Sequence, residues 1–201
     1  MNLIDKLAAL RAHGGTKRTT GLGDATVQQL AASHPDLVQA IDAAVLAYGA
    51  VLNDYPELLD LDEDAQMREV QADFVNFYAE DAVNPYVALV ARGPWVITLK
   101  GAVLHDSGGY GMLGFGHTPE HVLAAMAKPQ VMANIMTPNL SQLRLAQALR
   151  KEIGHRRSGC PYTRFLCLNS GSESVTLAGR IADINAKLMT ESGARHAGRA
   201  I

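Results

Sequence analysis

A short polar loop at residues 169–174, with the sequence Asn-Ser-Gly-Ser-Glu-Ser, carries the residue types best suited to chemistry in this chain. It stands between a predicted buried strand at residues 162–168 and a predicted helix that starts near Val175. Backbone N–H groups at a helix start, the helix dipole and serine hydroxyls all favour an anion. The loop therefore predicts a phosphate site at Gly171 and Ser172. The alternative is an ordinary strand-to-helix turn whose serines only cap the helix.

A second candidate is the glycine-rich run at residues 109–114, which has the spacing Gly-x-Gly-x-x-Gly of a dinucleotide-binding loop. That motif needs a helix that opens directly on the glycines, and the next helix signal lies beyond it, at Thr118 and Pro119. A loop that lets two backbones approach closely is the preferred interpretation. A small nucleotide-binding domain is kept as the less favoured hypothesis.

Two further patterns are weaker. His117 and His121 are four residues apart, as metal ligands on one helix face would be, but His117 precedes the predicted helix start and the order H-E-x-x-H is absent. No metal site is predicted, and capping explains both histidines. Residues 14–17, Gly-Gly-Thr-Lys, lack the first glycine of a nucleotide-binding loop and follow a helix, so they are predicted to form a flexible loop.

Helices dominate the first part of the chain. Residues 1–10, 36–53 and 62–78 place apolar side chains at helical spacing, so roughly the first ninety residues are predicted to be helical. An Asn-Pro pair at positions 84 and 85 ends this region.

The pattern then changes to mixed strands and helices. Two short runs with β-type composition, residues 95–99 and 102–105, flank a Lys-Gly pair and predict a hairpin. Amphipathic helices are predicted over residues 121–127 and 141–153. Together with the elements around the polar loop, this order indicates an α/β layer arrangement behind a helical N-terminal segment.

Composition limits the class of protein. The chain has 201 residues, 48% of them hydrophobic, and a net charge of −2. It can bury a real core, and without a basic face it is a poor candidate for binding nucleic acid. The only cysteines, Cys160 in a loop and Cys167 in the predicted strand, have no metal-ligand spacing, so a reducing compartment is expected. Cys167 is predicted to be a core residue, and Cys160 has no activating partner.

No membrane or secretory segment is predicted. No apolar run approaches the roughly 20 residues of a membrane helix, and the N-terminus has helical spacing with Asp5 and Lys6 inside it rather than the pattern of a signal peptide. A cytoplasmic location without a membrane partner is therefore expected.

Taken in order, four motifs resemble the class III aminotransferases, the ornithine, GABA and ω-amino-acid type. The similarity extends from about residue 85 to about residue 188. Each motif is weak alone, but four in the right order and spacing are fairly specific. They are the opening hairpin at residues 95–106, the Gly-His-Thr-Pro-Glu-His-Val element at 116–122, the Leu-Ala-Gln-Ala-Leu run at 145–149 and the Asn-Ser-Gly-Ser-Glu loop at 169–173.

The resemblance implies an α/β fold, the N-terminal part of a fold-type-I transferase that depends on pyridoxal 5'-phosphate. Residues 1–84 would be a helical N-terminal extension that the family does not usually carry at this length. Residues 85–154 would supply the small-domain hairpin, the glycine-rich loop and the linking helices. Residues 155–201 would start the large-domain sheet that binds the cofactor.

The resemblance also implies an activity, the transfer of an amino group between an amine or amino acid and a keto acid, in a homodimer. By carry-over, Gly171 and Ser172 would hold the cofactor phosphate, with Ser170 a further candidate. Tyr110 occupies a place where some members present an aromatic ring toward the substrate. Glu173 is common in the family motif, but no chemical role follows for it.

The sequence departs from the family in one important respect. The Schiff-base lysine of the family lies well after the phosphate loop, and none of the six lysines of this chain stands in a matching context. The expectation is therefore a truncated portion that has a phosphate site, has no catalytic residues and is inactive alone. The alternative is a non-catalytic interaction or binding module that keeps the aminotransferase N-terminal architecture.

Overall fold

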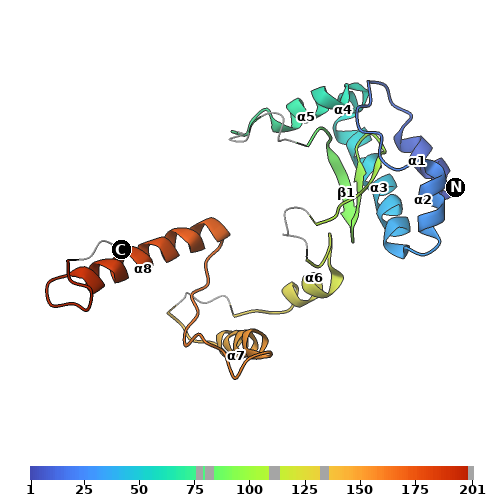
Figure 1. Ribbon diagram of the computed structural model, residues 1–201. Coiled ribbons are helices and arrows are strands. Elements are labelled where there is room, and N and C mark those ends of the chain that lie inside the picture. The colour runs from blue at the N-terminus through green and yellow to red at the C-terminus, as the bar shows by residue number, and fades with distance from the viewer. Residues whose placement is uncertain (76–78, 80–83, 109–113, 132–135, 199–201) are drawn as a thin grey trace. The chain divides into compact units, whose positions relative to one another are not determined.

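The computed structural model of the chain describes residues 1–75, 79, 84–108, 114–131 and 136–198 (Figure 1). The chain divides into two compact units, Met1–Pro129 and Gln130–Ile201. In the described part of the chain, the first unit holds both helices and a sheet, and the second holds helices alone. The predicted hairpin therefore lies in the mixed first unit, and the polar loop at residues 169–174 lies in the helical second unit.

A three-stranded antiparallel sheet is the centre of the first unit. Its strands are β1 (Ala88–Arg92), β2 (Trp95–Thr98) and β3 (Val103–His105), in the order β1-β2-β3. The hairpin predicted around Lys100 and Gly101 is confirmed, and Gly101 takes the positive φ of 73° that its turn requires. Strand β1 was not predicted, because its sequence Ala-Leu-Val-Ala-Arg lacks the alternation of a half-buried strand.

Helix α3 links the sheet to the other helices of the first unit, because α1, α2 and α4 pack against α3. Helix α3 lies against β1 and β2 and also contacts α1, as Figure 1 shows. The core side chains of α3 (Leu37, Ile41 and Ala44) are fully buried. The helices predicted at the N-terminus and over residues 36–53 are confirmed, whereas α2 and α4 were not predicted. The bounds are α1 (Leu3–Leu10), α2 (Asp24–Ala31), α3 (Pro35–Asp54), α4 (Pro56–Asp60), α5 (Glu63–Gln71) and α6 (Glu120–Met126).

Helix α3 departs from the expectation that no apolar segment reaches membrane length. Its 20 residues have a mean hydropathy of 1.3 and pass the length and composition test for a membrane span. The apolar side of α3 faces the sheet and α1, and charged residues such as Asp36 and Asp42 lie elsewhere on it. This distribution is that of a core helix in a folded unit.

The loop predicted at residues 14–17 is present, and its backbone has hydrogen-bond partners that the sequence did not indicate. Its backbone N–H groups donate to carboxylates at the end of α4 and at the start of α5. Gly14 N donates to Asp60 Oδ1 at 3.1 Å, and Thr16 N donates to Asp62 Oδ1 at 2.6 Å. Just beyond, Arg18 N and Thr19 N both donate to Glu63 Oε2, at 2.7 and 2.6 Å. The glycines let the chain follow these acceptors closely, since a side chain at Gly15 would overlap the Leu61 carbonyl.

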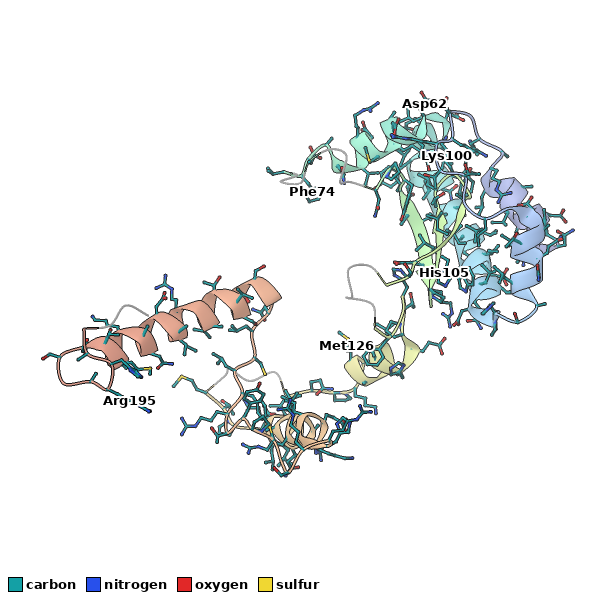
Figure 2. All side chains as sticks on the ribbon, viewed as in Figure 1. Asp62, Phe74, Lys100, His105, Met126 and Arg195 are labelled. Carbon is teal, nitrogen blue, oxygen red and sulfur yellow. The ribbon has the colours of Figure 1, made fainter. Side chains whose placement is uncertain are left out.

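Lys100, which is labelled in Figure 2, connects the hairpin to this loop through a buried side chain. Its side chain is 4% exposed, and Nζ donates to the carbonyl oxygens of Leu59, at 2.8 Å, and of Gly14. Burial lowers the pKa of Lys100, and the nearby Lys17 ammonium lowers it further, against the opposing effect of the neighbouring carboxylates. The lysine therefore joins three segments that are distant in sequence.

The second unit contains α7 (Leu140–Gly154) and α8 (Gly171–Thr190). The helix predicted over residues 141–153 is confirmed, and Asn139 caps it. The strand predicted at residues 162–168 is wrong, because these residues are irregular and Leu166 and Leu168 are exposed. A strand needs a neighbour for its backbone N–H and C=O groups, and the described part of this unit offers none.

The buried lysine gives a first prediction. Replacing Lys100 with Met keeps the apolar stem but leaves two carbonyl oxygens without their donor, which costs about 2 kcal/mol of unfolding free energy. The free energy is measured by urea unfolding followed through Trp95 fluorescence. Lys128→Met, at an exposed site, is the matched control and should be close to neutral. Equal unfolding midpoints for the two variants would show that the internal bonds of Lys100 contribute nothing.

The loop at residues 14–17 gives a second prediction, which concerns the stability of the fold in acid. The bonds from Gly14 N and Thr16 N are the main causes that hold the pKa values of Asp60 and Asp62 below their ordinary values. Groups with a lowered folded pKa stabilise the fold above their unfolded pKa, about 4, and lose that contribution as the pH falls. Asp60→Asn/Asp62→Asn should therefore flatten the fall in stability below pH of about 4. An acid unfolding curve that keeps its slope in the double variant would contradict this.

Candidate functional site

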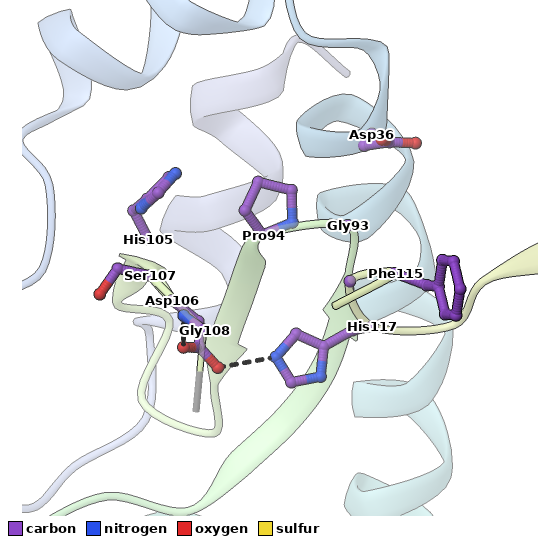
Figure 3. A pocket seen from close by; sticks show the side chains of 10 residues that line it. Asp36, Gly93, Pro94, His105, Asp106, Ser107, Gly108, Phe115 and His117 are labelled. Carbon is purple, nitrogen blue, oxygen red and sulfur yellow. Dashed lines mark hydrogen bonds and ion pairs between the residues drawn. The ribbon is translucent and has the colours of Figure 1, made fainter. Parts of the chain in front are cut away.

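A pocket of about 420 Å³ lies in the first unit, where the turn between β1 and β2 meets the end of β3. Figure 3 shows it from close by. Its wall includes Gly116 and His117 from the Gly-His-Thr-Pro-Glu-His-Val element at 116–122, so the sequence motif and a cavity coincide. The lining residues are Asp36, Gly93, Pro94, His105, Asp106, Ser107, Gly108, Phe115, Gly116 and His117.

The carboxylate of Asp106 is the central polar group of this pocket. Its Oδ2 lies 3.0 Å from His117 Nε2, and its Oδ1 accepts a bond of 2.9 Å from Gly108 N. His117 is held independently, because its backbone exchanges two hydrogen bonds with Gly93, of 2.8 and 2.9 Å. One side chain thus ties together both ends of the glycine-rich segment, at Gly108 and at His117.

Gly116 provides a close approach of two backbones next to this tie. Its φ is 74°, and a Cβ at this position would lie 3.0 Å from the Cα of Gly93. The close approach expected of the glycine-rich run is thus found at Gly116, just beyond it. Positions 109–113 lie outside the described residues, and Gly114 has open space where a Cβ would stand.

The described residues that line the pocket do not form an activated nucleophile. In Figure 3 the Ser107 hydroxyl points away from the His117 imidazole, so the three residue types of a hydrolase triad are present without its geometry. His105 packs edge-on against Trp95, with ring centroids 5.1 Å apart. The polar groups of the pocket therefore position the chain and can bind a ligand, but they do not form a proton relay to a hydroxyl.

The described residues contain no group of three His, Cys, Asp or Glu side chains placed to hold a metal. His117 bonds Asp106, whereas the His121 ring meets Phe115 edge-on at 5.3 Å. Thr118, the predicted helix cap, has a φ of 50° and donates its hydroxyl to Ala91 O at 2.8 Å instead. Pro119 is the residue at the start of α6.

The second candidate site is the start of α8 in the second unit, where three of the predicted site residues lie. Ser170 is the N-cap, and its hydroxyl accepts a bond of 3.2 Å from Glu173 N. Glu173 Oε2 accepts in return from Asn169 N and Ser170 N, at 3.0 and 3.1 Å. This reciprocal arrangement is a capping box, and it gives Glu173 the role that sequence reasoning could not assign.

The capping box leaves two donors at the first turn of α8. Within the described residues, the backbone N–H groups of Gly171 and Ser172 have no acceptor, as expected for the first positions of a helix. A Cβ at Gly171 would meet no atom within 4 Å, so the fold itself does not require glycine there. The two open N–H groups and the helix dipole favour an anion, while the Glu173 carboxylate opposes it.

The remaining predicted residues have different outcomes. Tyr110 lies outside the described residues. Cys167 is exposed, so its prediction as a core residue is wrong, because the strand that would have buried it does not form. Cys160 is half-buried, and its Sγ donates to Tyr162 O at 3.5 Å.

Gly116 gives a third prediction. Gly116→Ala should destabilise the first unit by about 2 kcal/mol, because alanine at this φ is strained and its Cβ would press on Gly93. Gly114→Ala is the matched control, since its Cβ enters open space and its stability should change by less than about 1 kcal/mol. Urea unfolding of both variants measures the difference. Indistinguishable stabilities would mean that the backbone contact between Gly93 and Gly116 is not constrained.

Comparison with known proteins identifies no relative of this chain. No protein-family model, no curated protein and no solved structure matches the chain. The motif order, the pocket around Asp106 and the open helix start at Gly171 are therefore the grounds on which a function is assigned.

Proposed function

We propose that this chain is the N-terminal portion of a class III, pyridoxal-phosphate-dependent aminotransferase, and that Gly171 and Ser172 bind the phosphate of its cofactor. The observation that carries the proposal is the pair of backbone N–H groups that the capping box leaves open at the start of α8. They belong to the last of the four motifs whose order resembles the family. Ser170 takes a supporting role, because its hydroxyl is engaged in capping.

The donor set at α8 fits a phosphate group. Two backbone N–H groups converge at the positive end of a 20-residue helix, and the Ser172 side chain adds a hydroxyl. Gly171 leaves room for an anion to approach the backbone, although nothing in the chain itself excludes a Cβ there. The Glu173 carboxylate is the opposing feature, and it is directed to Asn169 N and Ser170 N rather than to the open pair.

The cofactor, when bound, supplies an electron sink for a carbanion at the substrate carbon. The residues of this chain would bind and orient that cofactor. Gly171 and Ser172 would fix the phosphate end. Lys187, at the far end of α8, lies about 24 Å along the helix axis from Gly171, too far to reach a small molecule held there. Because none of the six lysines stands in the family's Schiff-base context, the chain alone is expected not to catalyse amino transfer.

The pocket around Asp106 supports the proposal that residues near it contact the substrate. Tyr110 belongs to the segment whose two ends Asp106 ties together, at Gly108 and His117. We propose that Tyr110 contacts the amino-group donor or the keto acid, as the resemblance implies. The activity, the two substrate classes, the homodimer and the cytoplasmic location all belong to the proposal.

A second candidate function is favoured by one observation. No described residue of α7 or α8 is buried. The helices expose many large apolar side chains, and such surfaces are typical of regions that another chain covers. A non-catalytic interaction module would need this surface but no phosphate site. The exposed side chains include Leu140, Leu143, Leu145, Val175, Ile181, Ile184 and Leu188.

The phosphate assignment gives a fourth prediction. Inorganic phosphate and pyridoxamine phosphate should shift the amide NMR signals of Gly171 and Ser172 in a saturable way, whereas pyridoxamine should not. The amine form of the cofactor avoids unspecific reaction of an aldehyde with lysines. Gly171→Ala should weaken binding of both phosphates by about tenfold, since a Cβ obstructs the approach to the backbone.

Gly179→Ala is the matched control, in the same helix and with equally open space for its Cβ. It should stabilise the helix slightly and leave phosphate binding unchanged. Amide signals that do not respond to either phosphate would favour the interaction module. Amino transfer catalysed by the purified 201-residue chain would overturn the expectation that it is inactive alone.

A further inference from the structure

A groove of about 660 Å³ lies along α4 and α5, on the helical segment for which the family resemblance implies no role. Its apolar lining comes from Tyr55, Leu58, Leu61 and Val70. Tyr55 is 62% exposed and Val70 is 47% exposed, so the groove opens to the surface. Phe74, which is labelled in Figure 2, and Val75 follow directly in sequence and are also exposed.

Three carboxylates stand in the same groove. Glu57, Glu69 and Asp73 line it, and none of them has a hydrogen-bond or ion-pair partner among the described residues. Arg68, the only arginine of α5, acts on Asp62, whose pKa it helps to lower. The groove therefore combines an apolar floor with unpaired negative charge.

Neighbouring carboxylates of the same segment behave differently. Asp60, Asp62 and Glu63 bind backbone N–H groups of the loop that follows α1, and Asp64 pairs with Arg18 at 3.0 Å. These acidic residues have a structural partner, and those in the groove do not. The groove therefore presents negative charge that a cationic partner would complement.

We propose that this groove docks a basic amphipathic helix of a partner protein. The apolar floor suits the apolar stripe of such a helix, and the three carboxylates suit lysine or arginine side chains that flank the stripe. The backbone lining the groove is that of helices α4 and α5 and their flanks, so no strand edge is offered for an extended peptide. The apolar contact would supply most of the affinity, and the charges would supply selectivity and a fast association. The inference is independent of the aminotransferase proposal.

The test uses the full chain and synthetic helical peptides. One peptide carries leucine at helical spacing with lysine at the remaining positions, and a second keeps the leucines but replaces each lysine with glutamate. The lysine peptide should shift the amide signals of Leu58, Leu61 and Val70, and added salt should weaken its binding. The glutamate peptide should bind at least about tenfold more weakly. Equal binding of the two peptides would overturn the proposal.

Charge reversal within the groove locates the site. Glu69→Lys/Asp73→Lys should weaken the lysine peptide by about tenfold or more. Glu152→Lys/Asp183→Lys changes the net charge equally at exposed positions of the second unit and should leave binding nearly unchanged. Val70→Asn, which keeps the charges, should also weaken binding through loss of apolar contact. Equal losses in both double variants would mean unspecific charge attraction, and self-association abolished by the groove variant would make a second copy the occupant; either result overturns the proposal.

Discussion

The first unit depends on a lysine ammonium held away from solvent at the tip of a hairpin. Lys100 binds the carbonyl oxygens of Gly14 and Leu59, and Arg11 Nε reaches the neighbouring Gly101 carbonyl at 2.9 Å. A buried charge is costly unless its donors are satisfied, so the surrounding chain must present acceptors to it. That requirement fixes where the loop after α1 and the end of α4 meet the hairpin.

The carboxylates near Lys100 also hold the loop after α1 in place. Glu63, which is 1% exposed, binds two backbone N–H groups of the loop after α1 and lies near enough to the ammonium to oppose the fall in its pKa. Glu63 at the start of α5 is thus buried inside the unit, whereas Glu69 near the end of the helix is exposed. A single helix serves both packing and surface charge.

Much of the first unit could be predicted from sequence, because its signals are local. The periodicity of residues 36–53 and the Lys-Gly turn at 100–101 each specify an element without reference to distant residues. The loop at 14–17 could not be predicted in the same way. Glycine and threonine indicate flexibility, and the carboxylates that hold these residues lie more than forty positions away in sequence.

The candidate site at the start of α8 could likewise be predicted only in part. The polar loop was correctly placed directly before a helix, but the helix begins at Gly171 rather than near Val175, so residues 171–174 form its first turn. The open N–H groups of that turn follow from helix geometry. The role of Glu173 in the capping box required coordinates, although its spacing from Ser170 was a sequence signal for it. The strand at residues 162–168 was predicted from composition, but composition cannot supply the neighbour that a strand needs.

The bonds of Asp106 to Gly108 and His117 have a consequence for how this region can vary. Both ends of the intervening segment are anchored by one carboxylate and by the backbone pairing of His117 with Gly93. Two points of the chain that are nine positions apart, Gly108 and His117, thus share one carboxylate. A single substitution at Asp106 would release both points from each other, whereas His117 would still be held to Gly93 by its backbone pairing.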